Sequence, residues 1–171
     1  RGDALQLGIG LSTYVEITAG DGGGETARVV VHPDGTVTVF TGSSAHGQGH
    51  ATSWAMLVND ELGIPMDQIT VIHGDTDEIP NGVGTMASRS LQVGGVAVLQ
   101  ATLEVKDEAR KLAAELLEAS ESDLVLDTGS GLWQVRGTPQ TGLTWSRLAE
   151  QAGPDGLSAD VEFTPKQPTF P

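Results

Sequence analysis

Two glycine-rich segments, each followed directly by a helical pattern, constrain the fold of this chain more than any other feature. Residues 47–50 read Gly-Gln-Gly-His, and residues 82–90 read Gly-Val-Gly-Thr-Met-Ala-Ser-Arg-Ser. Glycine adopts backbone conformations that other residues avoid, so both segments predict tight connections between regular elements. Apolar residues then recur at helical spacing over 51–62 and 88–119, and Gly63 ends the first pattern.

Short runs of β-branched and apolar residues predict strands around these helices. Two of them, 27–32 and 36–41, flank Pro-Asp-Gly and predict a β-hairpin. Further strands are expected at 6–18, 69–72, 124–126, 132–135 and 161–163, and a short helix at 143–152 with Thr144 as its cap. Because hairpins alternate with helices, the expected fold class is α+β, with a mixed or antiparallel sheet and packed helices.

The charge and composition of the chain exclude several classes of function. Nine basic residues stand against 23 acidic ones, a net charge of −14, so nucleic acid and anionic lipid are not expected as partners. The absence of Cys excludes a disulfide framework and thiolate metal sites within these 171 residues. The longest apolar stretch, 93–99, is about a third of a membrane span. We therefore expect a cytoplasmic protein without membrane insertion.

Both glycine-rich segments have the features of an anion-binding loop. The N-terminus of a helix directs unpaired N–H groups and a positive dipole toward the preceding loop. In the first segment the Gln48 carboxamide can also donate, and in the second the hydroxyls of Ser88 and Ser90 and the guanidinium of Arg89 can join it. The alternatives are ordinary glycine-rich turns, with Ser88 a simple N-cap and Arg89 solvated.

Other polar residues give weaker signals. His46 and His50 straddle a turn rather than share a helix face, so no metal site is expected there. Asp75 and Asp77 lack the twelve-residue pattern of a calcium loop and predict a turn instead. No spacing nominates a nucleophile and base, so no catalytic residue is expected in this chain.

Eight short motifs in order give the chain a family resemblance. They are 8–11 (Gly-Ile-Gly-Leu), 14–16 (Tyr-Val-Glu), 35–39 (Gly-Thr-Val-Thr-Val), 47–52 (Gly-Gln-Gly-His-Ala-Thr), 60–65 (Asp-Glu-Leu-Gly-Ile-Pro), 74–77 (Gly-Asp-Thr-Asp), 82–85 (Gly-Val-Gly-Thr) and 88–90 (Ser-Arg-Ser). Together they resemble the large subunits of the molybdenum hydroxylases, the family of xanthine dehydrogenase and aldehyde oxidase. The similarity is greatest to the aerobic carbon monoxide dehydrogenase branch.

The resemblance implies a cofactor and places two groups of residues around it. Family members hold molybdenum on a pterin dithiolene, in bacteria usually as molybdopterin cytosine dinucleotide. By resemblance the first loop lies near the pterin and the second holds the phosphates. The residues concerned are Gly47, Gln48, Gly49, His50, Thr85, Met86, Ala87, Ser88, Arg89 and Ser90.

The resemblance also implies a place within a larger assembly. We expect residues 1–171 to be one segment of the molybdopterin-binding domain, with 6–120 as the cofactor-loop core and 121–171 as a hairpin plus a short helix. The family's catalytic Glu and copper-binding Cys fall outside this sequence, and Met56 stands where relatives commonly have Gln. The implied partners are the rest of the large subunit, flavin (FAD) and 2Fe–2S subunits, and a small-molecule substrate such as carbon monoxide, an aldehyde or an N-heterocycle. We therefore expect a segment that is not catalytic alone.

Two other classes of function remain open from the sequence. One is a self-standing acidic interaction domain in which the glycine-rich segments are only turns. The other is a nucleotide-binding module with its own hydrolytic activity, although the sequence has no P-loop lysine motif.

Overall fold

A four-stranded mixed sheet forms the centre of the molecule. The computed structural model describes residues 2, 5, 7–15, 17–20 and 23–166. The strands are β1 (Glu25–Val31), β2 (Val37–Thr41), β3 (Ile69–Ile72) and β7 (Leu157–Phe163), in the order β3-β2-β1-β7. Strand β1 is antiparallel to both β2 and β7, whereas β2 and β3 are parallel. The parallel pair is possible because a helix connects β2 to β3.

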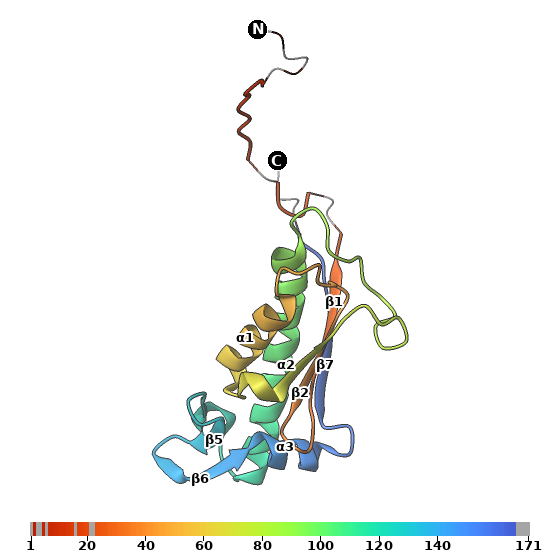
Figure 1. The fold of residues 1–171 in the computed structure, drawn as a ribbon. Helices are drawn as coiled ribbons and strands as arrows, with labels where there is room; N and C mark the ends of the chain where they lie inside the picture. The colour runs from red at the N-terminus through yellow and green to blue at the C-terminus, as the bar shows by residue number, and fades with distance from the viewer. Residues whose placement is uncertain (1, 3–4, 6, 16, 21–22, 167–171) are drawn as a thin grey trace.

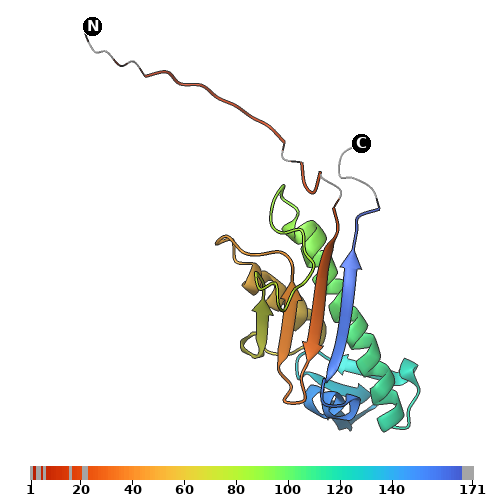
Figure 2. The ribbon, with the colours of Figure 1, turned by 90° about the vertical axis from the view of Figure 1, so that its right-hand side faces the viewer.

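Two helices cover one face of this sheet, as Figures 1 and 2 show from two sides. They are α1 (His50–Leu62) and α2 (Val96–Leu116), and a π-helical turn, η2 (Ser90–Gly95), leads into α2. Short 3-10 turns, η1 (Met66–Gln68) and η3 (Glu121–Asp123), precede β3 and β4. The opposite face of the sheet is not covered by any helix of the described chain.

A smaller antiparallel sheet lies beside the C-terminal end of α2 (Figure 1). It consists of β4 (Leu124–Asp127), β5 (Leu132–Val135) and β6 (Thr138–Thr144), and α3 (Trp145–Ala152) follows it. The Trp145 indole N–H donates to the carbonyl of Leu62 at 2.8 Å, and its ring packs edge-on against Trp133. These contacts fasten the small sheet to the end of α1.

The core lies between the helices and the large sheet. Alternate residues of β1 and β2 point inward, so their valines are buried. Helix α2 presents a buried stripe of alanines, because small side chains allow a helix to approach a sheet closely. The stripe comprises Ala97, Ala101, Ala109 and Ala113.

Most of the predicted elements are confirmed. The α+β class, the β1–β2 hairpin, α1 with its left-handed Gly63 cap, and the β4–β5 hairpin are all present. Thr144 is the N-cap of α3 and accepts from the N–H of Arg147 at 3.1 Å. The final strand, β7, begins four residues earlier than expected.

Three predictions need correction. The strand expected over 6–18 is wrong, because residues 7–15 and 17 have no regular structure and 7–15 are exposed; residues 6 and 16 lie outside the described part. The helical pattern expected over 88–119 is helical only over 90–116, as the π-helical turn η2 followed directly by α2. The change from one to the other falls at Gly94 and Gly95, which pack closely against Ser43 and Trp54, as a close-packing point in this pattern would. Strand β6 was not expected, and it includes Leu143, so α3 begins only at Trp145.

None of the helices in the described residues is long and apolar enough to cross a membrane.

Candidate functional site

The two glycine-rich loops, which are separated in sequence by residues 51–81, meet in space. Both precede a helix start at the same end of the molecule (Figure 1). Together they line a cavity of about 420 Å³, here called the loop cavity. Its lining residues are Gln48, His50, Ser53, Trp54, Thr85, Met86, Ala87, Ser88, Ser90 and Leu91. Gln48 and Ser88, the polar residues on which the sequence argument depended, therefore share one cavity.

The first loop leaves hydrogen-bond donors available at the start of α1. Gly47 and Gly49 have φ values of 112° and 80°, which only glycine adopts without strain. A Cβ atom at either position would meet nothing within 4 Å, so the backbone is open to a ligand. Gly49 is the N-cap of α1 and supplies no side-chain cap, so the first-turn N–H groups remain available. The Gln48 side-chain oxygen accepts from the N–H of His46 and so orients the carboxamide.

The second loop contains a strained turn. Ala87 and Ser88 have φ values of 48° and 52°, a left-handed conformation that costs residues with a Cβ about 1–3 kcal/mol each. Contacts on both sides hold this turn. The Ala87 carbonyl accepts from the N–H of Ala19 at 3.0 Å, and the Met86 carbonyl accepts from the N–H of Arg89 at 3.1 Å. Strain of this kind concentrates at ligand-binding sites, because the surrounding structure must maintain it.

A buried ion pair that the sequence reasoning missed supports both loops. The guanidinium of Arg89 lies 3.0 Å from a carboxylate oxygen of Glu25 at the start of β1, and both side chains are 0% exposed. Arg89 also donates to the carbonyls of Gly84, Gly23 and Gly24. The guanidinium is therefore buried rather than solvated, so the alternative of a solvated Arg89 is wrong. Arg89 does not line the loop cavity, and its contact with a cofactor stays a prediction.

The carboxylate of Glu25 connects the two loops to the sheet. It accepts from the hydroxyl of Ser43, ahead of the first loop, at 3.2 Å. It also accepts from the backbone N–H groups of Val83 and Gly84 in the second loop, each at 3.2 Å. Because one buried charge binds groups from both loops, the Glu25–Arg89 pair fixes their relative position.

The pattern of β1 contains a signal for Glu25. Residues 25, 27, 29 and 31 alternate with the outward positions of the strand, and the last three are Ala, Val and Val. Period-two alternation therefore places a carboxylate on the buried face, where it needs a cation. The sequence alone does not say which of the nine basic residues supplies it.

The loop cavity is suited to an anionic ligand. Its lining contains no Asp or Glu, although the chain as a whole has a net charge of −14. The indole N–H of Trp54 is buried and has no hydrogen-bond partner in the described structure. A buried donor without a partner costs about 1–3 kcal/mol. Hydroxyl groups of Ser53, Thr85 and Ser90 lie on the same walls, where Ser53 donates to the Gly49 carbonyl and Ser90 to the Thr85 hydroxyl. Polar walls without a carboxylate, beside the N-terminus of a helix, are compatible with an anionic group such as a phosphate.

The histidines near the cavity have structural contacts. His50 packs against Trp54 with ring centroids 5.2 Å apart, and its Nδ1 lies 3.3 Å from the Ser43 carbonyl oxygen. His46 reaches across to the carbonyl oxygen of Thr85 at 3.4 Å, so it bridges the two loops. Among the described residues, no three His, Asp or Glu side chains are arranged to hold a metal ion.

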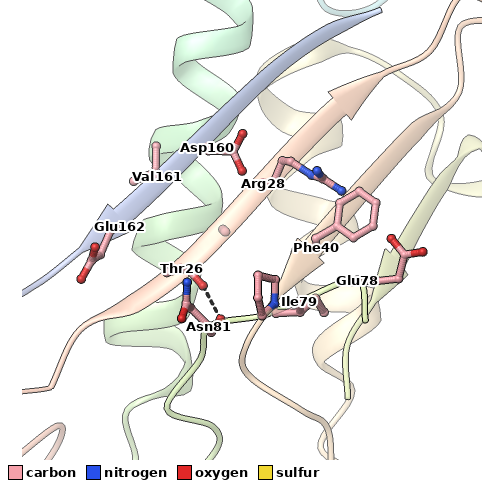
Figure 3. A pocket seen from close by; sticks show the side chains of 11 residues that line it. Thr26, Arg28, Phe40, Glu78, Ile79, Asn81, Asp160, Val161 and Glu162 are labelled. Atoms are coloured by element: carbon pink, nitrogen blue, oxygen red, sulfur yellow. Dashed lines mark hydrogen bonds between the residues drawn. The ribbon is translucent and has the colours of Figure 1, made fainter. Parts of the chain in front are cut away.

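A second cavity, of about 360 Å³, lies on the opposite face of the sheet and has different chemistry (Figure 3). The guanidinium of Arg28 lies 4.1 Å from the ring centre of Phe40, a cation–π contact. The other charged lining residues are the carboxylates Glu78, Asp160 and Glu162. The three carboxylates outnumber the one guanidinium, which is already in contact with the Phe40 ring, so their charge disfavours binding of an anion. This second cavity is therefore not an alternative cofactor site.

Comparisons with known proteins agree with the fold. A family profile described as the molybdopterin cofactor-binding domain matches residues 1–171. The gamma subunit of the 6-hydroxypseudooxynicotine dehydrogenase complex of Paenarthrobacter nicotinovorans is 44% identical over 100% of this chain and 22% of its own length. The carbon monoxide dehydrogenase large chain of Afipia carboxidovorans is 33% identical over 100% of this chain and 23% of its own length.

Solved structures show the same relationship. Reconstituted CO dehydrogenase from Oligotropha carboxidovorans superposes with a TM-score of 0.77 at 35% identity, over 85% of this chain and 19% of that one. Quinoline 2-oxidoreductase from Pseudomonas putida 86 superposes with a TM-score of 0.70 at 31% identity, over 84% of this chain and 19% of that one.

The fold and the family profile thus define the class of the chain, a molybdopterin cofactor-binding domain. The chain belongs to the molybdopterin cofactor-binding domain family, of the type found in molybdenum hydroxylase and carbon monoxide dehydrogenase large subunits. It spans about a fifth of the length of the relatives it matches.

Proposed function

We propose that this chain works as part of a longer large subunit and holds one molybdopterin dinucleotide in the loop cavity. The main support for the proposal is that two helix starts meet at a cavity without carboxylates. The start of α1 has no side-chain cap, and a strained turn at Ala87 and Ser88 precedes η2. We propose further that this dinucleotide is the cytosine form of the cofactor. When bound, the cofactor would supply a molybdenum centre for two-electron oxidation of a small molecule.

Each loop has a distinct role in this proposal. The carboxamide of Gln48 and the first-turn N–H groups of α1 would contact the pterin side of the cofactor. The backbone and hydroxyls of residues 85–90, except the buried guanidinium of Arg89, would contact the diphosphate. Trp54 lines the cavity, and its buried indole N–H would donate to an acceptor of the bound cofactor.

The partners and the location are proposals as well. One relative is named as the gamma subunit of a dehydrogenase complex and another as the large subunit of a hydroxylase. We propose that the whole protein passes electrons to subunits carrying 2Fe–2S clusters and FAD. The rest of the large subunit would supply the remaining cofactor contacts, the catalytic base and the substrate pocket. A cytoplasmic location stays a prediction from the sequence.

A titration of the isotopically labelled chain with cytidine diphosphate tests the proposal. We expect the amide signals of Gly49 and Ser88 to shift together and to saturate. Amides beside the second cavity, such as those of Arg28 and Asp160, serve as an internal control, and their signals should not shift. Shifts in neither loop would contradict the proposal and favour an acidic interaction domain.

A matched pair of variants sharpens the test. Trp54→Phe removes the indole N–H but keeps an aromatic ring against His50, and it is expected to weaken diphosphate binding about 5- to 10-fold, the loss of one hydrogen bond. Trp133→Phe removes a second buried and unpartnered indole N–H, far from the loops, and should leave binding unchanged. Equal effects of both variants would mean that Trp54 acts only through stability.

The full-length large subunit offers a second readout. Purified in its complex, it should contain molybdenum and pterin in about equal amounts. Metal analysis that finds neither would refute the assignment of the cofactor, whatever the result of the titration.

A further inference from the structure

A groove between α2 and the small sheet differs in chemistry from both cavities described above. Its volume is about 480 Å³, and small-molecule sites in proteins typically measure about 300–1,000 Å³. Side chains of α2 form one wall, and β4, β5 and Arg136, which follows β5, form the other. Figure 1 shows the small sheet beside α2, away from the two glycine-rich loops. No residue of the loop cavity lines this α2 groove, so the two sites are separate.

Basic side chains gather in the α2 groove although the chain as a whole is acidic. Three of the nine basic residues line it, namely Lys106, Arg110 and Arg136, together with the carboxylate of Asp107. Leu103, Lys106 and Arg110 are spaced three and four residues apart, so α2 presents all three on one face. In a chain with a net charge of −14, this local excess of positive charge favours an anionic ligand.

Two of these cations already have carboxylate partners at the edge of the groove. Lys106 lies 2.9 Å from Glu61, and Arg110 contacts Asp107 and lies 3.6 Å from Glu121. All five side chains are 29–49% exposed. Ion pairs that are open to water in this way contribute little, because each charge is also solvated. A ligand carboxylate can therefore compete for the same cations.

Arg136 supplies the positive charge that remains. Its side chain is exposed, and it has no ion-pair partner among the described residues. Its backbone N–H donates to the carbonyl of Asp123 at 2.8 Å, which fixes the residue beside the groove. Lys111 shares Asp107 with Arg110, so four cations face three carboxylates in and around the groove. The excess corresponds to one positive charge, which one carboxylate of a ligand would balance.

The rest of the lining is apolar. Leu103 and Val125 are 42% and 40% exposed, so apolar surface is open to a ligand in the groove. Trp133 lines the groove from β5 and is 2% exposed, and its indole N–H has no hydrogen-bond partner in the described structure. Buried donors nearly always have a partner, so a donor without one beside a groove is a second indication of a polar ligand. The combination indicates a ligand with an apolar body and one anionic group.

We propose that the α2 groove binds a small organic monocarboxylate with an apolar body. The carboxylate of the ligand would pair with the guanidinium of Arg136, because the planar N–H groups of Arg match a carboxylate in a two-bond contact. The apolar body would lie against Leu103, Val125 and Trp133. This site does not depend on a cofactor in the loop cavity, since the two sites share no residue.

A calorimetric titration of the full-length large subunit, held in its native complex, with 1-naphthoate tests the proposal. We expect saturable binding whose affinity falls as the salt concentration rises, because screening weakens the contact between the charges. 1-Naphthalenemethanol has the same rings without the charge and should bind at least about 10-fold more weakly. Absence of 1-naphthoate binding, or equal affinities for the two compounds, would overturn the proposal.

Two matched substitutions in the same complex locate the bound carboxylate. Arg136→Gln removes the guanidinium from the groove and should weaken 1-naphthoate binding about 10-fold. Arg147→Gln removes a guanidinium from α3, outside the groove, and should leave the affinity within about twofold of the parent. Both arginines are exposed, so neither variant should change the melting temperature much. Equal losses of affinity in the two variants would contradict a site at Arg136.

A second pair of variants tests the apolar wall. Val125→Asp places a carboxylate there and should weaken 1-naphthoate binding at least about 5-fold more than Val125→Asn, which has nearly the same shape without the charge. Equal effects of the two variants would overturn the proposal, because the carboxylate of the probe would then lie elsewhere.

A competition experiment separates this site from the loop cavity. Cytidine diphosphate, the probe for the loop cavity, should not displace 1-naphthoate, because no residue lines both sites. Displacement would place 1-naphthoate in the loop cavity and would overturn the proposal. Molybdenum analysis of the same sample concerns the cofactor alone: 1-naphthoate binding without molybdenum would refute the proposed function and support the groove site.

Discussion

Replacing Glu25 by Gln should strongly destabilise the chain, because the substitution removes one partner of a fully buried ion pair. The side chains of Glu25 and Arg89 are both 0% exposed, and their charged groups lie 3.0 Å apart. Breaking a buried pair costs about 3–5 kcal/mol, because the remaining charge stays buried without its counter-charge. The Gln side chain would also place its NH2 group, which is a donor, against the N–H donor of Val83 or Gly84, so one hydrogen bond would be lost.

The loss converts into a measurable shift in melting temperature. For a chain of 171 residues, 1 kcal/mol corresponds to about 2–4 °C, so a loss of about 4 kcal/mol predicts a shift of about 8–16 °C. Thermal unfolding followed by circular dichroism at pH 7 measures this shift. Asp107→Asn is the matched control, since Asp107 pairs with Lys111 at the exposed surface, and its melting temperature should change little.

A double-mutant cycle shows whether the loss arises from the pair itself. Arg89→Met removes the cation and keeps much of the side-chain length. The double variant Glu25→Gln/Arg89→Met buries no charge at this site, so it should be more stable than the sum of the single losses predicts, by about 2 kcal/mol. A Glu25→Gln variant that melts within about 3 °C of the parent, or strictly additive losses, would refute the view that this pair holds the two loops together.

Three further outcomes follow from local contacts. Gly94→Ala would place a Cβ 2.6 Å from the Ser43 hydroxyl, so it should displace that hydroxyl from the buried carboxylate and lower the melting temperature by about 3–10 °C, as measured by calorimetry. Thr144→Ala removes the side-chain cap of α3 and should cost about 1 kcal/mol in urea unfolding, whereas Thr144→Ser should not. The hydroxyl of Thr36, at 2.7 Å, lowers the pKa of Asp34 below its ordinary value of 3.8, so carboxyl NMR should show a higher pKa in Thr36→Val. Because the folded-state pKa is the lower one, this interaction stabilises the fold above pH 3.8 and its contribution is lost as the pH falls below that value, more steeply in the parent than in Thr36→Val.

Local sequence patterns were sufficient for most of the secondary structure. The hairpin turn at 33–35, the glycine stop at 63 and the cap at Thr144 are each determined by neighbouring residues, and each is found where the pattern places it. The strand predicted over 6–18 shows the limit of such patterns. Alternation of apolar residues indicates that a segment can form a strand, but a strand needs a partner for its backbone hydrogen bonds, and this structure provides none for residues 7–15.

Short-range features of this chain follow directly from its residues: two glycine-rich helix starts, their hydrogen-bond donors and the family resemblance that these segments carry. That Gln48 and Ser88 share a cavity is a property of the folded chain, because the sheet order β3-β2-β1-β7 and the packing of α1 on α2 bring the two helix starts together. The completed fold also places the guanidinium of Arg89 against Glu25, 64 residues away, rather than in solvent. Local patterns cannot specify that pairing, because the free energy of a buried charge depends on which distant groups the completed fold places around it.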